Sequence, residues 1–178
     1  MKTYNTAVVV IPPQEVWPPI QAIREQHDRQ IRRWMPHITM LYPFRPREEF
    51  PVLAERFAAV CAQQDPFPIT LATFRSFQHA RQRYTLWLAP EPKEPLVQLQ
   101  TLLWQVVPDC DDVRRYRGGF TPHLSVGQAQ GEAASQLLSS LQETWQPVTF
   151  LVDAVSLIWR DSPPDDVFRV GQVIRLGS

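Results

Sequence analysis

The sequence predicts an α+β fold built from two similar lobes, and three observations support it. Segments with strand and helix periodicity follow one another in the order strand, helix, strand, helix, strand, and this order occurs twice within 178 residues. No Gly- or Ser-rich linker separates the halves, so we expect one domain over residues 1–178. The second strand of each half carries the same short motif: proline, histidine, an apolar residue, a hydroxyl residue and another apolar residue.

In the first half, β-branched and apolar runs indicate strands, and apolar residues at helical spacing indicate helices. The polar segment Gln78–Gln82 is expected to form a hairpin turn before the second half begins. The expected elements are a strand at Thr6–Ile11, a helix at Glu15–His27, a strand at Pro36–Phe44, a helix at Glu48–Gln64 and a strand at Phe67–Phe77.

The same order follows in the second half, with a polar and charged loop, Asp109–Gly119, between its first helix and its second strand. One further strand ends the chain. The expected elements are a strand at Tyr84–Ala89, a helix at Pro95–Val107, strands at Phe120–Gln128 and Val148–Arg160 on either side of a helix at Glu132–Trp145, and the last strand at Phe168–Leu176.

The composition narrows the class of protein. Eighteen basic residues balance 18 acidic ones, which argues against tight, non-specific binding to long nucleic acids. Only Lys2 and Lys93 of the basic residues are lysines. Arginine forms forked hydrogen bonds to phosphate, although an arginine-rich composition also arises from genomic base content. Cys61 and Cys110 form no metal or disulfide pattern.

No apolar stretch approaches the roughly 20 residues of a membrane helix. The apolar run near the N-terminus is interrupted by Pro12-Pro13 and is too short for a signal peptide. We therefore expect no membrane association, a cytoplasmic location and a monomer.

The two motifs, Pro36-His37-Ile38-Thr39-Met40 and Pro122-His123-Leu124-Ser125-Val126, place polar side chains on one face of each strand. Because strand side chains alternate between faces, His37 lies beside Thr39 and His123 beside Ser125. A pseudo-twofold relation between the halves would bring both polar faces to one cleft.

Two imidazoles facing one cleft suit the cleavage of a phosphodiester. The reaction removes a proton from the attacking oxygen and delivers one to the leaving oxygen, and histidine exchanges protons near neutral pH. The hydroxyls of Thr39 and Ser125 would donate hydrogen bonds to the non-bridging oxygens. A single histidine on a strand is usually structural, but the same motif at matching places in both halves favours catalysis.

The segments His37-Ile38-Thr39-Met40 and His123-Leu124-Ser125-Val126 resemble the paired signature of the 2H phosphoesterase superfamily, and their contexts are most similar to the bacterial 2′-5′ RNA ligase-like branch. The resemblance covers nearly the whole chain. It implies a bilobal α+β fold in which antiparallel-rich sheets flank a central cleft and helices lie outside. It also implies hydrolysis of 2′,3′-cyclic or 2′-5′-linked phosphates, with an RNA terminus or a small nucleotide as substrate and no cofactor.

By the same resemblance, His37, Thr39, His123 and Ser125 form the catalytic and phosphate-binding set. For hydrolysis of a cyclic phosphate, we expect His123 to activate water and His37 to protonate the leaving oxygen. The reverse assignment stays open, because it depends on how the substrate is oriented. The sequence also leaves open whether hydrolysis or its reverse, ligation, is the biological direction.

Three arginines are candidate substrate ligands. Arg45 follows the first motif strand, Arg83 begins a strand after the hairpin, and Arg117 precedes Gly118-Gly119 just before the second motif strand. A solvated surface cation is the alternative interpretation for each of them.

Aromatic residues and the two remaining histidines are secondary candidates. Strand alternation points Tyr42 and Phe44 away from His37 and into the core, unless the strand bulges. Trp34 precedes the first motif, and a position at the rim of the cleft is the less favoured interpretation for it, whereas Trp87 is expected in the core. His27 and His79 are expected to be exposed and without a role.

Two other functions compete with a phosphodiesterase. The same cleft could bind a nucleotide or an RNA end without turnover. A metal site built on the paired histidines is the weakest alternative, because no carboxylate or cysteine joins the motifs at ligand spacing.

Overall fold

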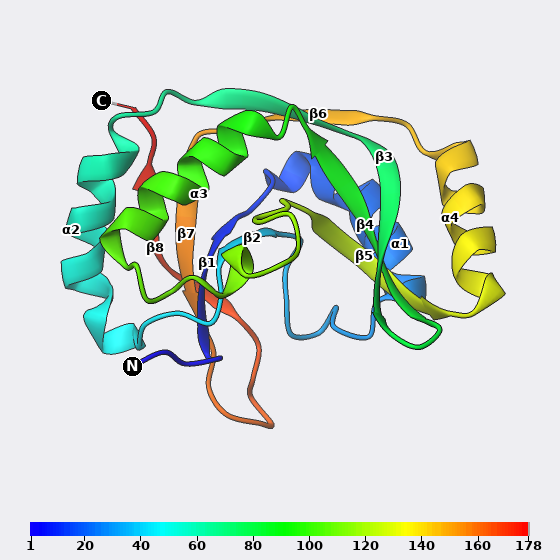
Figure 1. Ribbon diagram of the computed structural model, residues 1–178, viewed down its shortest axis with the longest axis horizontal. Helices are drawn as coiled ribbons and strands as arrows, with labels where there is room; N and C mark the ends of the chain where they lie inside the picture. The colour runs from blue at the N-terminus through cyan, green and yellow to red at the C-terminus, as the bar shows by residue number, and fades with distance from the viewer. Residues whose placement is uncertain (178) are drawn as a thin grey trace.

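The computed structural model describes residues 1–177, which form eight strands and four α-helices (Figure 1). The strands are β1 (Thr6–Val10), β2 (Ile38–Leu41), β3 (Phe67–Ala80), β4 (Arg83–Glu91), β5 (Leu124–Gln130), β6 (Val148–Val152), β7 (Ala154–Trp159) and β8 (Arg169–Arg175). The helices are α1 (Trp17–His27), α2 (Phe50–Cys61), α3 (Glu94–Val106) and α4 (Glu132–Thr144).

The strands form two four-stranded antiparallel sheets whose orders correspond. One sheet runs β2-β1-β7-β8 and the other runs β5-β4-β3-β6. The first two strands of each half stay together, whereas β3 crosses into the sheet of the second half and β7 into that of the first. The two halves of the sequence are therefore interlocked, and the predicted α+β fold with two antiparallel sheets is confirmed.

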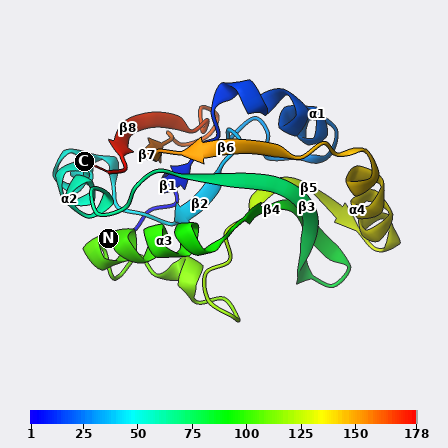
Figure 2. The ribbon, with the colours of Figure 1, turned by 90° about the horizontal axis from the view of Figure 1, so that it is seen from above.

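The helices cover the two sheets in pairs. Helices α2 and α3 pack on each other and on β8 and β2, whereas α1 and α4 pack on the second sheet. Figure 2 shows α2 and α4 at opposite ends of the molecule, with α1 and α3 on opposite sides. Helix α1 lies so close to β5 that a β-carbon on Gly127 would stand 2.6 Å from the β-carbon of His27. Helix α1 of the first half is thus fixed against the motif strand of the second half.

A continuous apolar core joins the two sheets. Ile38 and Met40 of β2 and Leu124 and Val126 of β5 are fully buried within it, as the alternating motif predicts. Burying these side chains stabilises the fold by roughly 1.5–3 kcal/mol each. The apolar face of each motif strand is therefore anchored in the core, which leaves the polar face free for chemistry.

One predicted strand is wrong. Val148–Arg160 is two strands, because the chain leaves the second sheet after Val152 and enters the first at Ala154. Both strands are apolar and β-branched, so the sequence has no breaker where they part. Asp153 lies at the crossing, where its carbonyl accepts the Leu176 N–H at 2.9 Å.

The boundaries of three other segments also differ from prediction. Strands β2 and β5 begin one residue after His37 and His123, since the prolines that precede both histidines have no N–H to donate to a ladder. Both histidines therefore stand at the entry of their strands. The hairpin turn is shorter than Gln78–Gln82, because β3 extends to Ala80 and β4 resumes at Arg83.

Both motif strands contain a β-bulge at the same position. Val8 pairs with Leu41 and Val9 with Thr39, which leaves Met40 as the additional residue. In the second sheet, Leu86 pairs with Gly127 and Trp87 with Ser125, which leaves Val126. The fourth residue of each motif, counted from its histidine, is thus bulged, and the two residues that follow it change face.

No helix in the range 1–177 combines the length and the apolarity that a membrane crossing requires.

Candidate active site

The two motif histidines are held in the same way. Nδ1 of His37 lies 2.8 Å from the carbonyl oxygen of Met35, and Nδ1 of His123 lies 2.9 Å from that of Thr121. In both cases the acceptor is the carbonyl two residues upstream. A carbonyl oxygen can only accept, so Nδ1 carries the proton and donates it. Nε2 of each neutral ring is therefore left as a base, and on protonation it becomes a donor.

Burial favours the neutral form of both rings. It lowers the pKa of His37 from 6.5 to about 4, aided by the positive charges of Arg24 and His123 and opposed by the bond to Met35 and by Asp28. Burial also lowers the pKa of His123, against the bond to Thr121. A charge on His123 therefore acts on the His37 ring across the cleft. Both are neutral in the free protein at pH 7.

The hydroxyl residues of the motif occupy matching positions. Thr39 pairs with Val9 and Ser125 with Trp87, each two residues beyond its histidine and half-buried. In the part of the chain that the structure describes, neither hydroxyl is hydrogen-bonded to another protein group. Both hydroxyls are therefore free to donate to a ligand.

Aromatic rings enclose both imidazoles. Trp34 stacks on His37 with ring centroids 4.4 Å apart and an interplanar angle of 17°. The edge of Phe77 meets His123 at 5.0 Å, and Trp87 lies 5.7 Å from it. These rings exclude water and thereby contribute to the lowered pKa of both histidines. Trp34 thus lies in the cleft, which was the less favoured interpretation of its position, whereas Trp87 is buried as predicted and also contacts His123.

The bulge after Thr39 explains the position of Tyr42. Simple alternation pointed Tyr42 away from His37, but Tyr42 lies on the side of Trp34, whose ring it meets edge-on at 5.2 Å. The predicted packing of Tyr42 is confirmed in part, because it is half-buried against a small apolar cluster that also contacts Trp34. Phe44 is fully buried, as predicted. Gln128, five residues after His123 as Tyr42 is after His37, likewise returns to the cleft side of its strand.

A buried ion pair links the cleft to α1. Nε of Arg24 donates to Asp28 at 2.9 Å, and its Nη2 donates to the Trp34 carbonyl at 2.8 Å. Asp28 also accepts the side-chain N–H of Gln128 at 3.0 Å. The side chains of Arg24 and Asp28 are only 2% and 4% exposed, so their charges depend on each other. This network holds the Trp34 segment of the first half against β5 of the second.

The cleft contains a pocket of about 380 Å³ that brings both halves together. His37 and Ser125 line it from opposite halves, so the structure unites members of the two motifs. Its wall further comprises Arg24, Asp28, Arg29, Gln30, Trp34, His79, Thr85 and Gln128. Among residues 1–177, no group of three or more His, Cys, Asp or Glu side chains is placed to hold a metal ion.

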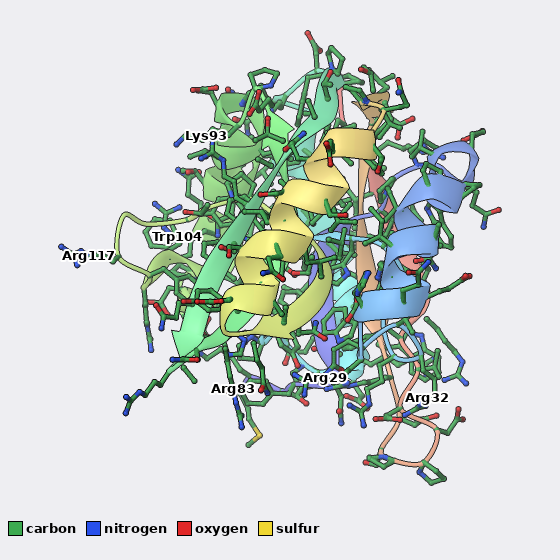
Figure 3. All side chains as sticks on the ribbon, turned by 90° about the vertical axis from the view of Figure 1, so that its right-hand side faces the viewer. Arg29, Arg32, Arg83, Lys93, Trp104 and Arg117 are labelled. Atoms are coloured by element: carbon green, nitrogen blue, oxygen red, sulfur yellow. The ribbon has the colours of Figure 1, made fainter. Side chains whose placement is uncertain are left out.

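The three candidate arginines lie in different environments. Arg45 is bound by Asp109 at 2.5 Å and by Glu49 at 3.4 Å, away from the pocket, and its charge is neutralised there. Arg117 extends from a loop into solvent on the side of the molecule opposite α1 (Figure 3). Arg83 lines a small pocket that adjoins the cleft.

Several cleft residues were missed in the sequence or given no role. His79, expected to be exposed and without a role, is exposed but lines the pocket with His37. Arg24 and Asp28 have the spacing of a helical ion pair, which was a signal available in the sequence. Gln128 could be found only by recognising the bulge that precedes it.

Comparison with known families identifies the chain. The family model described as "2'-5' RNA ligase superfamily" matches residues 12–164. The chain belongs to this family, within the 2H phosphoesterase superfamily. A protein of Geobacillus kaustophilus (strain HTA426) named "Putative phosphoesterase GK0864" is 27% identical over 126 residues, which cover 68% of this chain and 67% of that protein.

Solved structures share the fold. Escherichia coli LigT, in a crystal structure with 3′-AMP, superposes with a TM-score of 0.65 at 18% identity, covering 98% of this chain and 99% of LigT. The protein TT0787 of Thermus thermophilus gives a TM-score of 0.61 at 18% identity, with 98% and 99% covered. At these identities the likeness establishes the 2H phosphoesterase fold.

Removing the buried cation should destabilise this 2H protein strongly. We expect Arg24→Met to lower the free energy of unfolding by about 3–5 kcal/mol, because Asp28 keeps a buried, uncompensated charge. Adding Asp28→Asn removes that charge while keeping an acceptor for Gln128, and should recover part of the loss. Urea unfolding at pH 7 measures both effects.

The control is Arg32→Met. Arg32 also pairs with a carboxylate, Asp166, but its side chain is 55% exposed, so its loss should cost about 0–1 kcal/mol. Equal losses for Arg24→Met and Arg32→Met would show that the buried pair does not hold the cleft together.

Proposed function

We propose that the protein is a phosphodiesterase that hydrolyses 2′,3′-cyclic or 2′-5′-linked phosphates of RNA termini or small nucleotides without a metal ion. The observation that carries the proposal is the matched fixation of the two imidazoles. Each donates Nδ1–H to the carbonyl two residues upstream, so that Nε2 of each is available as acid or base. Family membership and the shared fold support a phosphoesterase, and the family description supports this class of phosphate.

In hydrolysis of a cyclic phosphate, the two rings act in opposite proton states. The neutral Nε2 removes a proton from water as the water oxygen bonds to phosphorus. The protonated Nε2–H of the other ring gives its proton to the ribose oxygen as the P–O bond breaks. The product is a phosphomonoester, and the two rings have exchanged proton states. General acid–base catalysis of this kind contributes about 10²–10⁴-fold for each group.

The hydroxyls of Thr39 and Ser125 complete the proposed site. Both are half-buried and have no protein partner in the described chain, and each stands two residues from its histidine on the same strand face. They would donate to the non-bridging oxygens, where negative charge accumulates in the transition state.

The surroundings of the rings bear on which histidine is the base. Arg24 lowers the pKa of His37, whereas no cation contributes to the lowered pKa of His123. This asymmetry favours neutral His37 as base and protonated His123 as acid. The opposite assignment, favoured by the sequence alone, stays a prediction that substrate orientation would decide.

Replacing either histidine tests the proposal. With a 2′,3′-cyclic mononucleotide and excess EDTA, we expect wild-type turnover, and we expect His37→Ala and His123→Ala each to lower kcat by at least about 100-fold. His27→Ala is the matched control, because it removes an imidazole outside the cleft but keeps the β-carbon that packs on Gly127.

Binding of the cyclic nucleotide by wild-type protein without product formation would instead identify a binding module. Turnover that appears only when a divalent metal is added would contradict the metal-free mechanism.

The pH dependence follows from the lowered pKa values. Activity requires one ring protonated and one neutral, and the pKa of each lies below 6.5 in the free protein. As pH rises above these values the acid loses its proton, so kcat/KM should peak below pH 6.5 and fall on the alkaline side. A bound phosphate favours imidazolium, so the profile of kcat should lie at higher pH. A kcat/KM optimum above pH 7 would refute this account.

A further inference from the structure

A second pocket continues the catalytic cleft beyond Ser125. It measures about 170 Å³ and shares Arg29, His79 and Gln128 with the pocket that contains His37 and Ser125. Arg83, Tyr84, Ala129 and Gln130 complete its wall. We call this extension, lined by Arg29, His79 and Arg83, the basic arm.

The basic arm carries positive charge that no carboxylate offsets. Arg29 and Arg83 are exposed and take part in none of the ion pairs found within residues 1–177. Asp28 is the single acid lining either pocket, and Arg24 already neutralises it. In Figure 3, Arg29 and Arg83 lie along the same lower edge of the molecule, with their side chains toward solvent.

The protein holds the arm in a defined position relative to the catalytic centre. Gln128 accepts the backbone N–H of Arg29 at 3.0 Å, while its own amide donates to the buried Asp28 at 3.0 Å. Arg83 pairs with Gln130 at the end of β5, the strand that also carries Ser125. Both cations are therefore fixed at their backbones, to the loop and sheet that form the active site, and only their side chains are free to adapt.

We propose that the basic arm binds the phosphodiester next to the reacting phosphate, so that the substrate is an RNA end of at least two nucleotides. The proposal rests on the phosphodiesterase function above. Arginine guanidinium groups bind phosphate oxygens through paired N–H donors, and two of them on one side of the cleft match the backbone of a single strand. A mononucleotide bearing a cyclic phosphate has no second phosphate to reach them.

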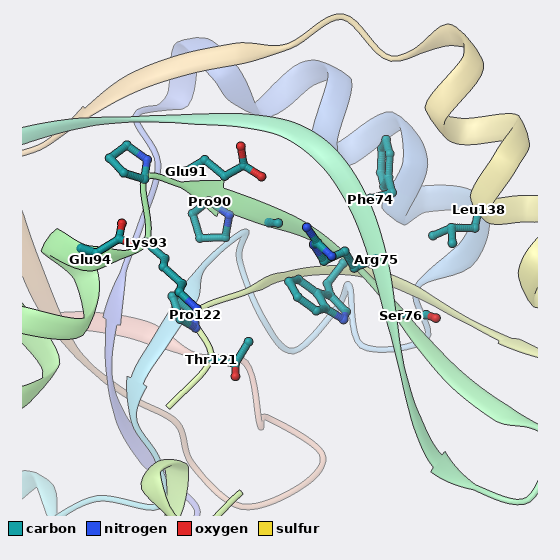
Figure 4. Close-up of a pocket in the computed structure, with 13 residues that line it drawn as sticks. Phe74, Arg75, Ser76, Pro90, Glu91, Lys93, Glu94, Thr121, Pro122 and Leu138 are labelled. Atoms are coloured by element: carbon teal, nitrogen blue, oxygen red, sulfur yellow. The ribbon is translucent and has the colours of Figure 1, made fainter. Parts of the chain in front are cut away.

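A separate pocket, which shares no lining residue with the catalytic pocket, is less suited to the RNA backbone. This larger pocket of about 940 Å³ has Trp87 in its wall and is lined by two cations, Arg75 and Lys93, and two carboxylates, Glu91 and Glu94 (Figure 4). These charges sum to zero, so this pocket offers no net attraction for a polyanion. It therefore provides a control with the same residue types near the same catalytic pair.

Two substrates with the same terminal base distinguish the contribution of the basic arm to kcat/KM from that of the two histidines. They are a 2′,3′-cyclic mononucleotide and a trinucleotide RNA that ends in the same cyclic phosphate. We expect wild-type kcat/KM to be higher for the trinucleotide. Arg29 also lines the pocket that contains His37, so Arg29→Ala/Arg83→Ala should lower the trinucleotide value by about tenfold more than it lowers the mononucleotide value. Each lost phosphate contact should also reduce the log–log salt slope by about 0.7.

Two further variants serve as controls. Arg75→Ala, in the larger pocket, should change neither substrate, and Arg29→Lys/Arg83→Lys, which keeps the charge, should restore part of the preference. The proposal would be overturned by equal wild-type kcat/KM on both substrates, or by equal losses on both substrates in Arg29→Ala/Arg83→Ala. Loss of the preference for the trinucleotide in Arg75→Ala would also overturn it.

Failure of the proposed function would be recognised separately, by the absence of product from both substrates. Fluorescence anisotropy with a labelled trinucleotide 3′-phosphate then still tests the arm. Weaker binding by Arg29→Ala/Arg83→Ala than by Arg75→Ala supports it, and equal binding by both variants contradicts it.

Discussion

The position of each motif imidazole depends on one hydrogen bond, from Nδ1 to the carbonyl two residues upstream. The bond sets the tautomer and the ring orientation, so Nε2 is available on both sides of the cleft. It forms at the entry of β2 and β5, where Pro36 and Pro122 cannot continue the ladder. The aromatic rings and the buried residues around the cleft exclude water, which raises the free-energy cost of charging either imidazole.

The interlocked topology brings the two Nδ1–carbonyl hydrogen bonds, one from each half of the sequence, to the same cleft. Because β3 and β7 exchange sheets, neither half of the sequence forms its sheet alone. Helix α1 and the Arg24–Asp28 pair add a second connection, since Asp28 of the first half accepts a hydrogen bond from Gln128 of the second. The distance between the histidines therefore depends on both halves being folded, which suits a reaction that needs two groups on opposite sides of one phosphorus.

The fold class and part of the candidate site could be predicted from the sequence. The paired motif and strand periodicity predicted the fold class and the faces of His37 and His123, because burial of Ile38 and Leu124 leaves no other register. The change of sheet at Asp153 was not readable, since both sides of it are apolar strands. The bulges at Met40 and Val126 were also missed, and with them the positions of Tyr42 and Gln128, because a bulge depends on pairing with a distant strand.

The proton state of the two rings is the central claim, and nitrogen-15 NMR of the imidazoles measures it directly. With labelled histidine, both His37 and His123 should show the Nδ1–H tautomer at pH 7 and titrate below pH 6.5, with His37 near pH 4. Adding inorganic phosphate should raise the pKa of at least one ring. An Nε2–H tautomer for either histidine, or a pKa above 7 in the free protein, would contradict the account.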